Sequence, residues 1–209
     1  GTGSLGDMGC HLIDIPFRAW KLKYPVSVEC SVSSLFSKMW EVKHQSIGCP
    51  ASSYVTINFK PTALNKNPIK LEWYDGGLRP SYPSLIPADT YLGGKRNTNG
   101  VIMIGEDGII TTDVYGKNPR LITKDKEVIT PKIKNLPKDD WGHQRMWIDA
   151  IKDGYGSSKH KMLTSSFDYA GPMTETVLMG NIAIRSYLLN KNGNPDSIRI
   201  TGKNRNSYY

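Results

Sequence analysis

The sequence is poor in cysteine and has no long apolar run. Its 209 residues include three cysteines, Cys10, Cys30 and Cys49, with no C-x-x-C pair. Neither a disulfide framework nor a zinc site is therefore predicted, and buried free thiols are expected. The sequence has no run of eighteen apolar residues, and its first fifteen residues lack a basic start followed by an apolar stretch. We therefore expect no membrane span and no secretory signal in these residues.

Several common catalytic motifs are also missing. The sequence contains no G-x-S-x-G, no H-E-x-x-H and no P-loop lysine motif, which removes the usual arguments for a hydrolase, a zinc protease or a kinase. His44, His143 and His160 lie among polar residues or beside a helix start, and we expect them to be structural or exposed. The segment 73–77 (WYDGG) is interpreted as a strand end and turn rather than a sugar-stacking platform.

Positive charge is in excess, but the basic residues are not clustered in the sequence. Lys and Arg number 27 against 19 Asp and Glu, a formal net charge of +8. The densest basic stretch, residues 115–140, mixes seven basic residues with four acidic ones. Because no basic helix or aromatic and basic recognition pattern stands out, we predict a solvated surface and no nucleic-acid partner.

The hydrophobic pattern indicates an α+β domain. With 38% hydrophobic residues, the chain is long enough to bury a substantial core. The predicted helices cover residues 7–22, 141–152 and 172–189, and the predicted strands cover 26–36, 54–59, 69–74, 101–104, 109–113 and 197–201. Strands grouped between helices predict one open, mainly antiparallel β-sheet with helices on one face, as a single unit over residues 1–209.

Local signals refine these elements. Asp7 is the predicted N-cap of the first helix, and Pro16 is expected to bend that helix. Residues 104–109 (IGEDGI) predict a hairpin turn with glycine at positive φ. Gly154 is the expected C-terminal cap of the helix over 141–152.

The opening helix carries the densest functional chemistry. Asp7, His11 and Asp14 stand at i, i+4 and i+7, which places three polar side chains on one helix face. A carboxylate one turn before an imidazole can orient the ring for proton transfer. The same residues could instead cap the helix, hydrogen-bond locally and be solvated, or, less simply, hold a metal ion. Gly9 beside them would allow a ligand or a second backbone to approach closely.

The first six residues match a dinucleotide-binding fingerprint only in their glycines. Gly1, Gly3 and Gly6 fit G-x-G-x-x-G, and Glu29 lies where a ribose-binding acid is expected. The fingerprint requires a strand before the first glycine, and the helix that follows carries Pro16. A flexible entry to a helix is therefore the preferred interpretation.

Four stretches resemble one enzyme family. They are residues 3–14 (GSLGDMGCHLID), 71–77 (LEWYDGG), 143–154 (HQRMWIDAIKDG) and 167–175 (FDYAGPMTE). In this order they resemble the second domain of the Gfo/Idh/MocA oxidoreductases, the glucose-fructose oxidoreductase and inositol dehydrogenase family, in its bacterial branch. The resemblance implies an α+β C-terminal domain over residues 1–209, with the N-terminal Rossmann domain missing from this sequence, and a homo-oligomer formed through the sheet.

The resemblance also implies roles for the stripe on the first helix. In the family's D-x-x-x-H pattern the histidine, here His11, is the acid/base group, and the aspartate, here Asp7, helps to hold substrate and imidazole. Asp14 matches a further position that can meet substrate hydroxyls. The family's catalytic lysine and cofactor-binding glycines belong to the absent domain. NAD or NADP is therefore expected in the intact protein and not on this chain alone.

The expected function follows from these implied roles. The chain is predicted to be the substrate-binding and catalytic-base domain of an NAD(P)-dependent oxidoreductase that acts on a sugar, polyol or related hydroxy compound, inactive by itself. A non-catalytic carbohydrate-binding or assembly module and an NAD-dependent glycosidase are the alternatives. No membrane partner is expected, and a cytoplasmic and an exported location both remain open.

Overall fold

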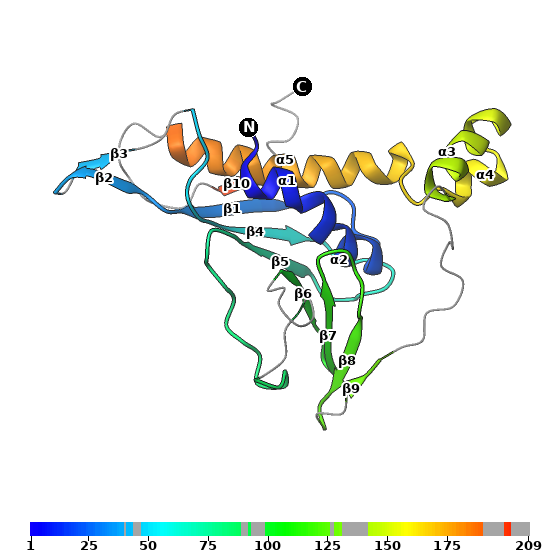
Figure 1. The fold of residues 1–209 in the computed structure, drawn as a ribbon, viewed down its shortest axis with the longest axis horizontal. Coiled ribbons are helices and arrows are strands. Elements are labelled where there is room, and N and C mark those ends of the chain that lie inside the picture. Colours follow the sequence, from blue (N-terminus) through cyan, green and yellow to red (C-terminus); the bar gives the residue numbers. More distant parts are fainter. Residues whose placement is uncertain are drawn as a thin grey trace.

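The computed structural model describes residues 1–39, 41–43, 47–88, 92, 99–125, 128–130, 142–189 and 199–201 (Figure 1). The helices are α1 (Gly3–Leu12), α2 (Asp14–Ala19), α3 (Gly142–Asp153), α4 (Ser158–Met162) and α5 (Phe167–Leu189). The strands are β1 (Ser27–Val32), β2 (Leu35–Lys38), β3 (Glu41–Lys43), β4 (Ser53–Phe59), β5 (Ile69–Tyr74), β6 (Gly100–Ile104), β7 (Gly108–Asp113), β8 (Arg120–Thr123), β9 (Val128–Ile129) and β10 (Arg199–Thr201).

The strands form antiparallel sheets, and the helices α1 and α5 cover one face of the main sheet. That sheet has the order β10-β1-β4-β5, with α1 and α5 lying along it (Figure 1). A second four-stranded sheet has the order β6-β7-β8-β9, and β2 pairs with β3. The predicted α+β class with an open antiparallel sheet and helices on one face is confirmed. The strands are distributed over three described sheets, because β5 and β6 do not pair.

Alternation along the central strands produces the core. In β4 every second residue is buried, namely Ser53, Val55, Ile57 and Phe59. These positions face the helices, since side chains of a strand point alternately to its two faces. The core under the helices also contains Leu5, Ile13, Phe17, Leu22, Val28, Cys30, Ile69, Trp73, Val177, Met179, Ala183 and Ile184. Its position fixes α1 against both the sheet and α5.

Two glycines allow α1 and α5 to approach closely. A Cβ on Gly9 of α1 would lie 3.2 Å from a methyl carbon of Val177, and one on Gly180 of α5 would lie 2.5 Å from a methyl carbon of Leu5. The close approach expected at Gly9 is therefore made by a second helix of the same chain.

The first helix differs from its prediction at both ends. It begins at Gly3, so Asp7 lies inside α1, and the N-cap Thr2 makes no side-chain capping bond. The helix ends at Leu12, and α2 restarts at Asp14. Pro16 has no N–H to donate to the carbonyl of Leu12, which explains a break just before it. The expected bend at Pro16 is thus a division into two helices.

The second sheet has a small core of its own and a hairpin without left-handed glycines. Ile86, Ile109 and Ile122 are buried together. In the β6–β7 turn the Gly105 N–H donates to the Gly108 carbonyl at 2.9 Å. Neither glycine has positive φ, which corrects that expectation. Gly108 is instead needed for close packing, because a Cβ there would lie 2.5 Å from the carbonyl oxygen of Ile122 on β8.

The remaining helices match their predictions in part. Gly154 ends α3 with φ of +89° and donates its N–H to the Ala150 carbonyl, as a C-terminal cap. The apolar face of α3 is largely exposed, however, with Trp147 59% and Ile151 60% exposed. Helix α5 begins at Phe167 instead of Pro172, which lies inside it. None of the helices in the described part of the chain has the length and apolar character needed to cross a membrane.

Only one of the three cysteines is buried. Cys30 lies in the core, and its burial raises the pKa of its thiol to about 11. Cys10 is exposed and Cys49 is half-buried, which corrects the expectation of three buried thiols. All three are free thiols.

Candidate functional site

Asp7 and His11 lie on the exposed side of α1, one helical turn apart. Both residues are exposed. Among the described residues, neither side chain makes a hydrogen bond or an ion pair. The His11 ring makes one aromatic contact, with Tyr115 in the turn after β7, at 5.3 Å between ring centroids and an interplanar angle of 76°. The imidazole nitrogens and the carboxylate are therefore available to an external molecule.

Asp14 lies in a different environment from Asp7 and His11. The Tyr169 hydroxyl of α5 donates to Asp14 Oδ1 at 2.5 Å, and Arg18 Nη2 lies 3.6 Å from the same oxygen. The Arg18 guanidinium also stacks on the Tyr169 ring, with Cζ 4.1 Å from the centroid. This cluster ties α2 to α5. The stripe predicted for one face is thus divided between two helices with different contacts.

The Asp14 cluster perturbs a tyrosine. Partial burial raises the pKa of Tyr169 above its usual range, and its hydrogen bond to Asp14 and the negative charge of that carboxylate add to the effect. Each of these factors favours the neutral phenol. Tyr169 therefore acts as a hydrogen-bond donor at neutral pH, and Asp14 acts as its acceptor.

Metal binding finds no support in the described part of the chain. No group of three His, Cys, Asp or Glu side chains there has an arrangement that could hold a metal ion. Asp7, His11 and Asp14 do not converge, because Asp14 is bound to Tyr169 while His11 contacts Tyr115.

The glycines of the N-terminal fingerprint start a helix. Gly3 has φ of +63°, and the Gly6 N–H donates to the Thr2 carbonyl at 3.1 Å, a helical hydrogen bond. A Cβ on Gly3 would lie 2.8 Å from Cys49 Sγ, so this glycine also allows a close contact. Glu29 lies in β1, inside an antiparallel sheet. Gly3 and Gly6 therefore lie at the entry to a helix, as the preferred interpretation expected.

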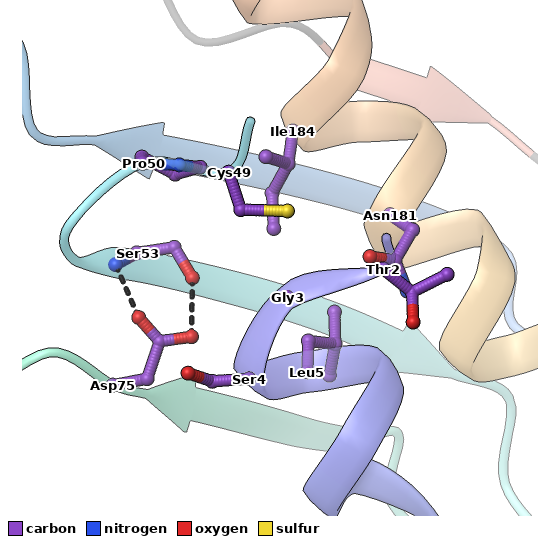
Figure 2. A pocket seen from close by; sticks show the side chains of 10 residues that line it. All are labelled: Thr2, Gly3, Ser4, Leu5, Cys49, Pro50, Ser53, Asp75, Asn181 and Ile184. Carbon is purple, nitrogen blue, oxygen red and sulfur yellow. Dashed lines mark hydrogen bonds between the residues drawn. The ribbon is translucent and has the colours of Figure 1, made fainter. Parts of the chain in front are cut away.

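A small pocket lies at the opposite end of α1. Its lining residues are Thr2, Gly3, Ser4, Leu5, Cys49, Pro50, Ser53, Asp75, Asn181 and Ile184 (Figure 2). Its cavity volume is about 20 Å³, room for roughly one water molecule. At a rise of 1.5 Å per residue, Gly3 and His11 are about 12 Å apart along the helix. The pocket is therefore separate from the Asp7 and His11 face.

The carboxylate in that pocket, Asp75, already accepts hydrogen bonds from neighbouring strands. Asp75 accepts hydrogen bonds from Ser53 N at 2.6 Å and from Ser53 Oγ at 2.7 Å (Figure 2). It also accepts one from Trp73 Nε1 at 2.8 Å. Gly76 and Gly77 follow with φ of +63° and +94°. The segment 73–77 is a strand end and turn, as predicted, and its carboxylate joins β5 to β4.

Two further histidines, His143 and His160, lie among the described residues. His160 Nδ1 accepts the Gly156 N–H at 3.3 Å, and its ring packs on Tyr155 at 4.5 Å between centroids. His143 is exposed near the start of α3, and His44 lies outside the described residues. His160 is structural and His143 exposed, as expected for both.

Sequence reasoning missed Tyr115, the aromatic neighbour of His11. The available signal was the turn sequence DVYGK at residues 113–117, in which Asp and Gly favour a turn after a strand. Nothing in that signal says which other element the turn contacts.

No protein-family model matches the chain, and a comparison with curated proteins found no significant match.

Proposed function

We propose that this chain is the substrate-binding and acid/base part of an NAD(P)-dependent oxidoreductase that acts on a sugar, polyol or related hydroxy compound. One observation carries the proposal: Asp7 and His11 are the two positions of the D-x-x-x-H motif, and both side chains are exposed and have no hydrogen bond to another described residue. Asp14 and Asp75, in contrast, accept hydrogen bonds within the fold.

The role of this chain in the reaction is proton transfer. Oxidation of an alcohol breaks the O–H and C–H bonds of one carbinol group and forms a carbonyl. His11, in its neutral form, accepts the hydroxyl proton and becomes imidazolium. The family resemblance assigns the hydride acceptor, NAD or NADP, to a separate dinucleotide-binding domain.

The decisive experiment compares two histidines in the full-length protein that carries this chain. Reduction of NAD and NADP is followed at 340 nm with a panel of hexoses and cyclic and linear polyols. His11→Ala should lower turnover by roughly 100- to 10,000-fold, the usual contribution of a general base. His160→Ala is the matched control and should retain wild-type turnover, because its imidazole contacts only its own helix region. A His11→Ala protein with wild-type turnover would overturn the proposal.

A second measurement separates the alternatives. Calorimetry of this chain alone should show no binding of NAD or NADP, and micromolar affinity would contradict the assignment of the cofactor to another domain. Product analysis distinguishes net hydrolysis of a glycoside, expected of an NAD-dependent glycosidase, from accumulation of a carbonyl product. Binding of sugars without turnover of any hydroxy compound would favour the carbohydrate-binding module.

An assembly role rests on one surface of the second sheet. Ile110, Leu121 and Ile129 lie side by side on β7, β8 and β9, and all three are exposed. Such a row is typical of a sheet face that another molecule covers. It supports the proposed homo-oligomer, and a Leu121→Lys protein that sediments as the wild-type oligomer would argue against this face.

A further inference from the structure

The turn that carries Tyr115 is fixed by a buried carboxylate. Asp113 is buried at the end of β7, and its Oδ1 accepts the N–H of Tyr115 at 2.8 Å and of Lys117 at 2.7 Å. The Asp113 N–H donates to the Lys117 carbonyl at 3.0 Å, and the Gly116 N–H donates to the Asp113 carbonyl at 3.2 Å. Hydrogen bonds to a charged acceptor are the stronger kind. The backbone that presents Tyr115 is therefore well defined.

The same turn is docked on the α1–α2 segment at two points. Tyr115 contacts the His11 ring. At Gly116, where φ is +74°, a Cβ would lie 3.6 Å from Ile15 of α2, an ordinary packing distance. Val114, which directly precedes Tyr115, is buried and anchors the turn in the fold. The second sheet thus delivers an aromatic ring to the end of α1 from a segment distant in the sequence.

Core packing does not explain where the Tyr115 ring lies. The residue is 62% exposed, in contrast to its neighbours Asp113 and Val114. Its contact with His11 is T-shaped, so at least one face of the Tyr115 ring remains uncovered by the imidazole. The two ring centroids are 5.3 Å apart, so one small molecule can contact both side chains.

We propose that Tyr115 is the stacking wall of the His11 site and selects cyclic over linear hydroxy compounds. This inference rests on the proposed function. A cyclic sugar or polyol has an apolar face of C–H groups and a rim of hydroxyls. Its C–H face packs on Tyr115, and a rim hydroxyl meets His11. Aromatic walls with a few placed polar groups are the usual composition of small-molecule sites. A linear polyol lacks a comparable face and gains less from the ring.

The test uses the full-length protein and two probes, myo-inositol as the cyclic compound and sorbitol as the linear one. Binding of each is measured by calorimetry without cofactor, for the wild type, Tyr115→Phe, Tyr115→Ala and Tyr155→Ala. Tyr155 is the matched control, because it is also an exposed tyrosine paired with a histidine ring. Thermal melting of each variant checks folding, and an exposed ring should leave it unchanged.

Tyr115→Ala should weaken myo-inositol binding about tenfold or more, the scale of one lost aromatic contact with its buried area. Sorbitol binding should change much less, and Tyr115→Phe and Tyr155→Ala should behave as the wild type. Equal losses for both probes would overturn the inference, as would unchanged myo-inositol affinity in Tyr115→Ala or a wild type that binds no cyclic probe. If the wild type shows the Tyr115-dependent preference but no hydride transfer, the oxidoreductase proposal fails and the stacking wall stands.

Discussion

The α1–α2 segment has two faces with opposite properties. On one face Leu5, Gly9, Ile13 and Phe17 recur every four residues, and all are buried against α5 and the main sheet. On the other face Asp7 and His11 are exposed and have no polar partner among the described residues. Stability and the candidate chemistry are therefore carried by different residues of one segment. Substitutions on the buried face should therefore lower the free energy of unfolding more than substitutions on the exposed face.

Phe17→Ala should cause the largest loss of unfolding free energy. Phe17 is 1% exposed and packs edge-on against Phe59 at 6.3 Å and Tyr169 at 5.7 Å between centroids. Truncating a buried phenylalanine removes its apolar burial and leaves a cavity, at a cost of about 3 to 5 kcal/mol. Urea unfolding measures the change, with Phe17→Leu as the milder control. A loss below 1 kcal/mol would show that this face is not the structural one.

Tyr169→Phe should have an intermediate effect, because it removes the hydrogen bond from α5 to Asp14. The bond is partly exposed, so we expect a loss of about 1 kcal/mol. The raised pKa of Tyr169 favours the neutral phenol in the folded state. Its contribution is therefore complete below the unfolded-state pKa of about 10 and is lost as the pH rises towards the folded-state pKa.

The measurement is the unfolding free energy of both proteins from pH 7 to pH 11. The advantage of the wild type over Tyr169→Phe should be constant up to about pH 9 and decline above pH 10. A difference that instead grows with pH would contradict the assigned role of Asp14 as acceptor.

His11→Ala and Asp7→Asn should have the smallest effect on folding. Exposed side chains without internal partners typically change stability by less than about 0.5 kcal/mol. The same urea titration measures both variants, and their turnover is assayed in parallel in the full-length protein. A loss above 1.5 kcal/mol in either variant would mean that the open face also supports the fold, and the division between the two faces would fail.

Much of the fold could be predicted because the patterns are local. The hydrophobic pattern predicted β4 and β5 to within one residue, and Gly154 marked the end of α3. The start of α1 was missed because Asp7 is a favoured capping residue. The helix extends back to Gly3, since Leu5 packs against Gly180 of α5. Packing between distant segments overrode a local preference there, and one sequence does not reveal such a contact.

The candidate site could also be predicted only where it depends on local sequence. The spacing of Asp7 and His11 correctly predicted a shared face, because both lie in α1. Extending the pattern to Asp14 assumed a continuous helix, and the break before Pro16 removes that assumption. Tyr115 was out of reach, since its position beside His11 depends on how the second sheet meets α2. That the site acts on a sugar or polyol stays a prediction.

The pairing of β1 with β10 has a consequence for how the molecule folds. In this pair Glu29 lies opposite Arg199, at nearly the other end of the sequence. The hairpins of β6 to β9, in contrast, join neighbouring segments. Local hairpins close quickly, whereas contacts across most of a chain must wait for a large loss of chain entropy. During synthesis, the second sheet and the turn that carries Tyr115 can form before α5 and β10 exist. Helix α1 packs against α5, so that contact can form only after α5 has been synthesised.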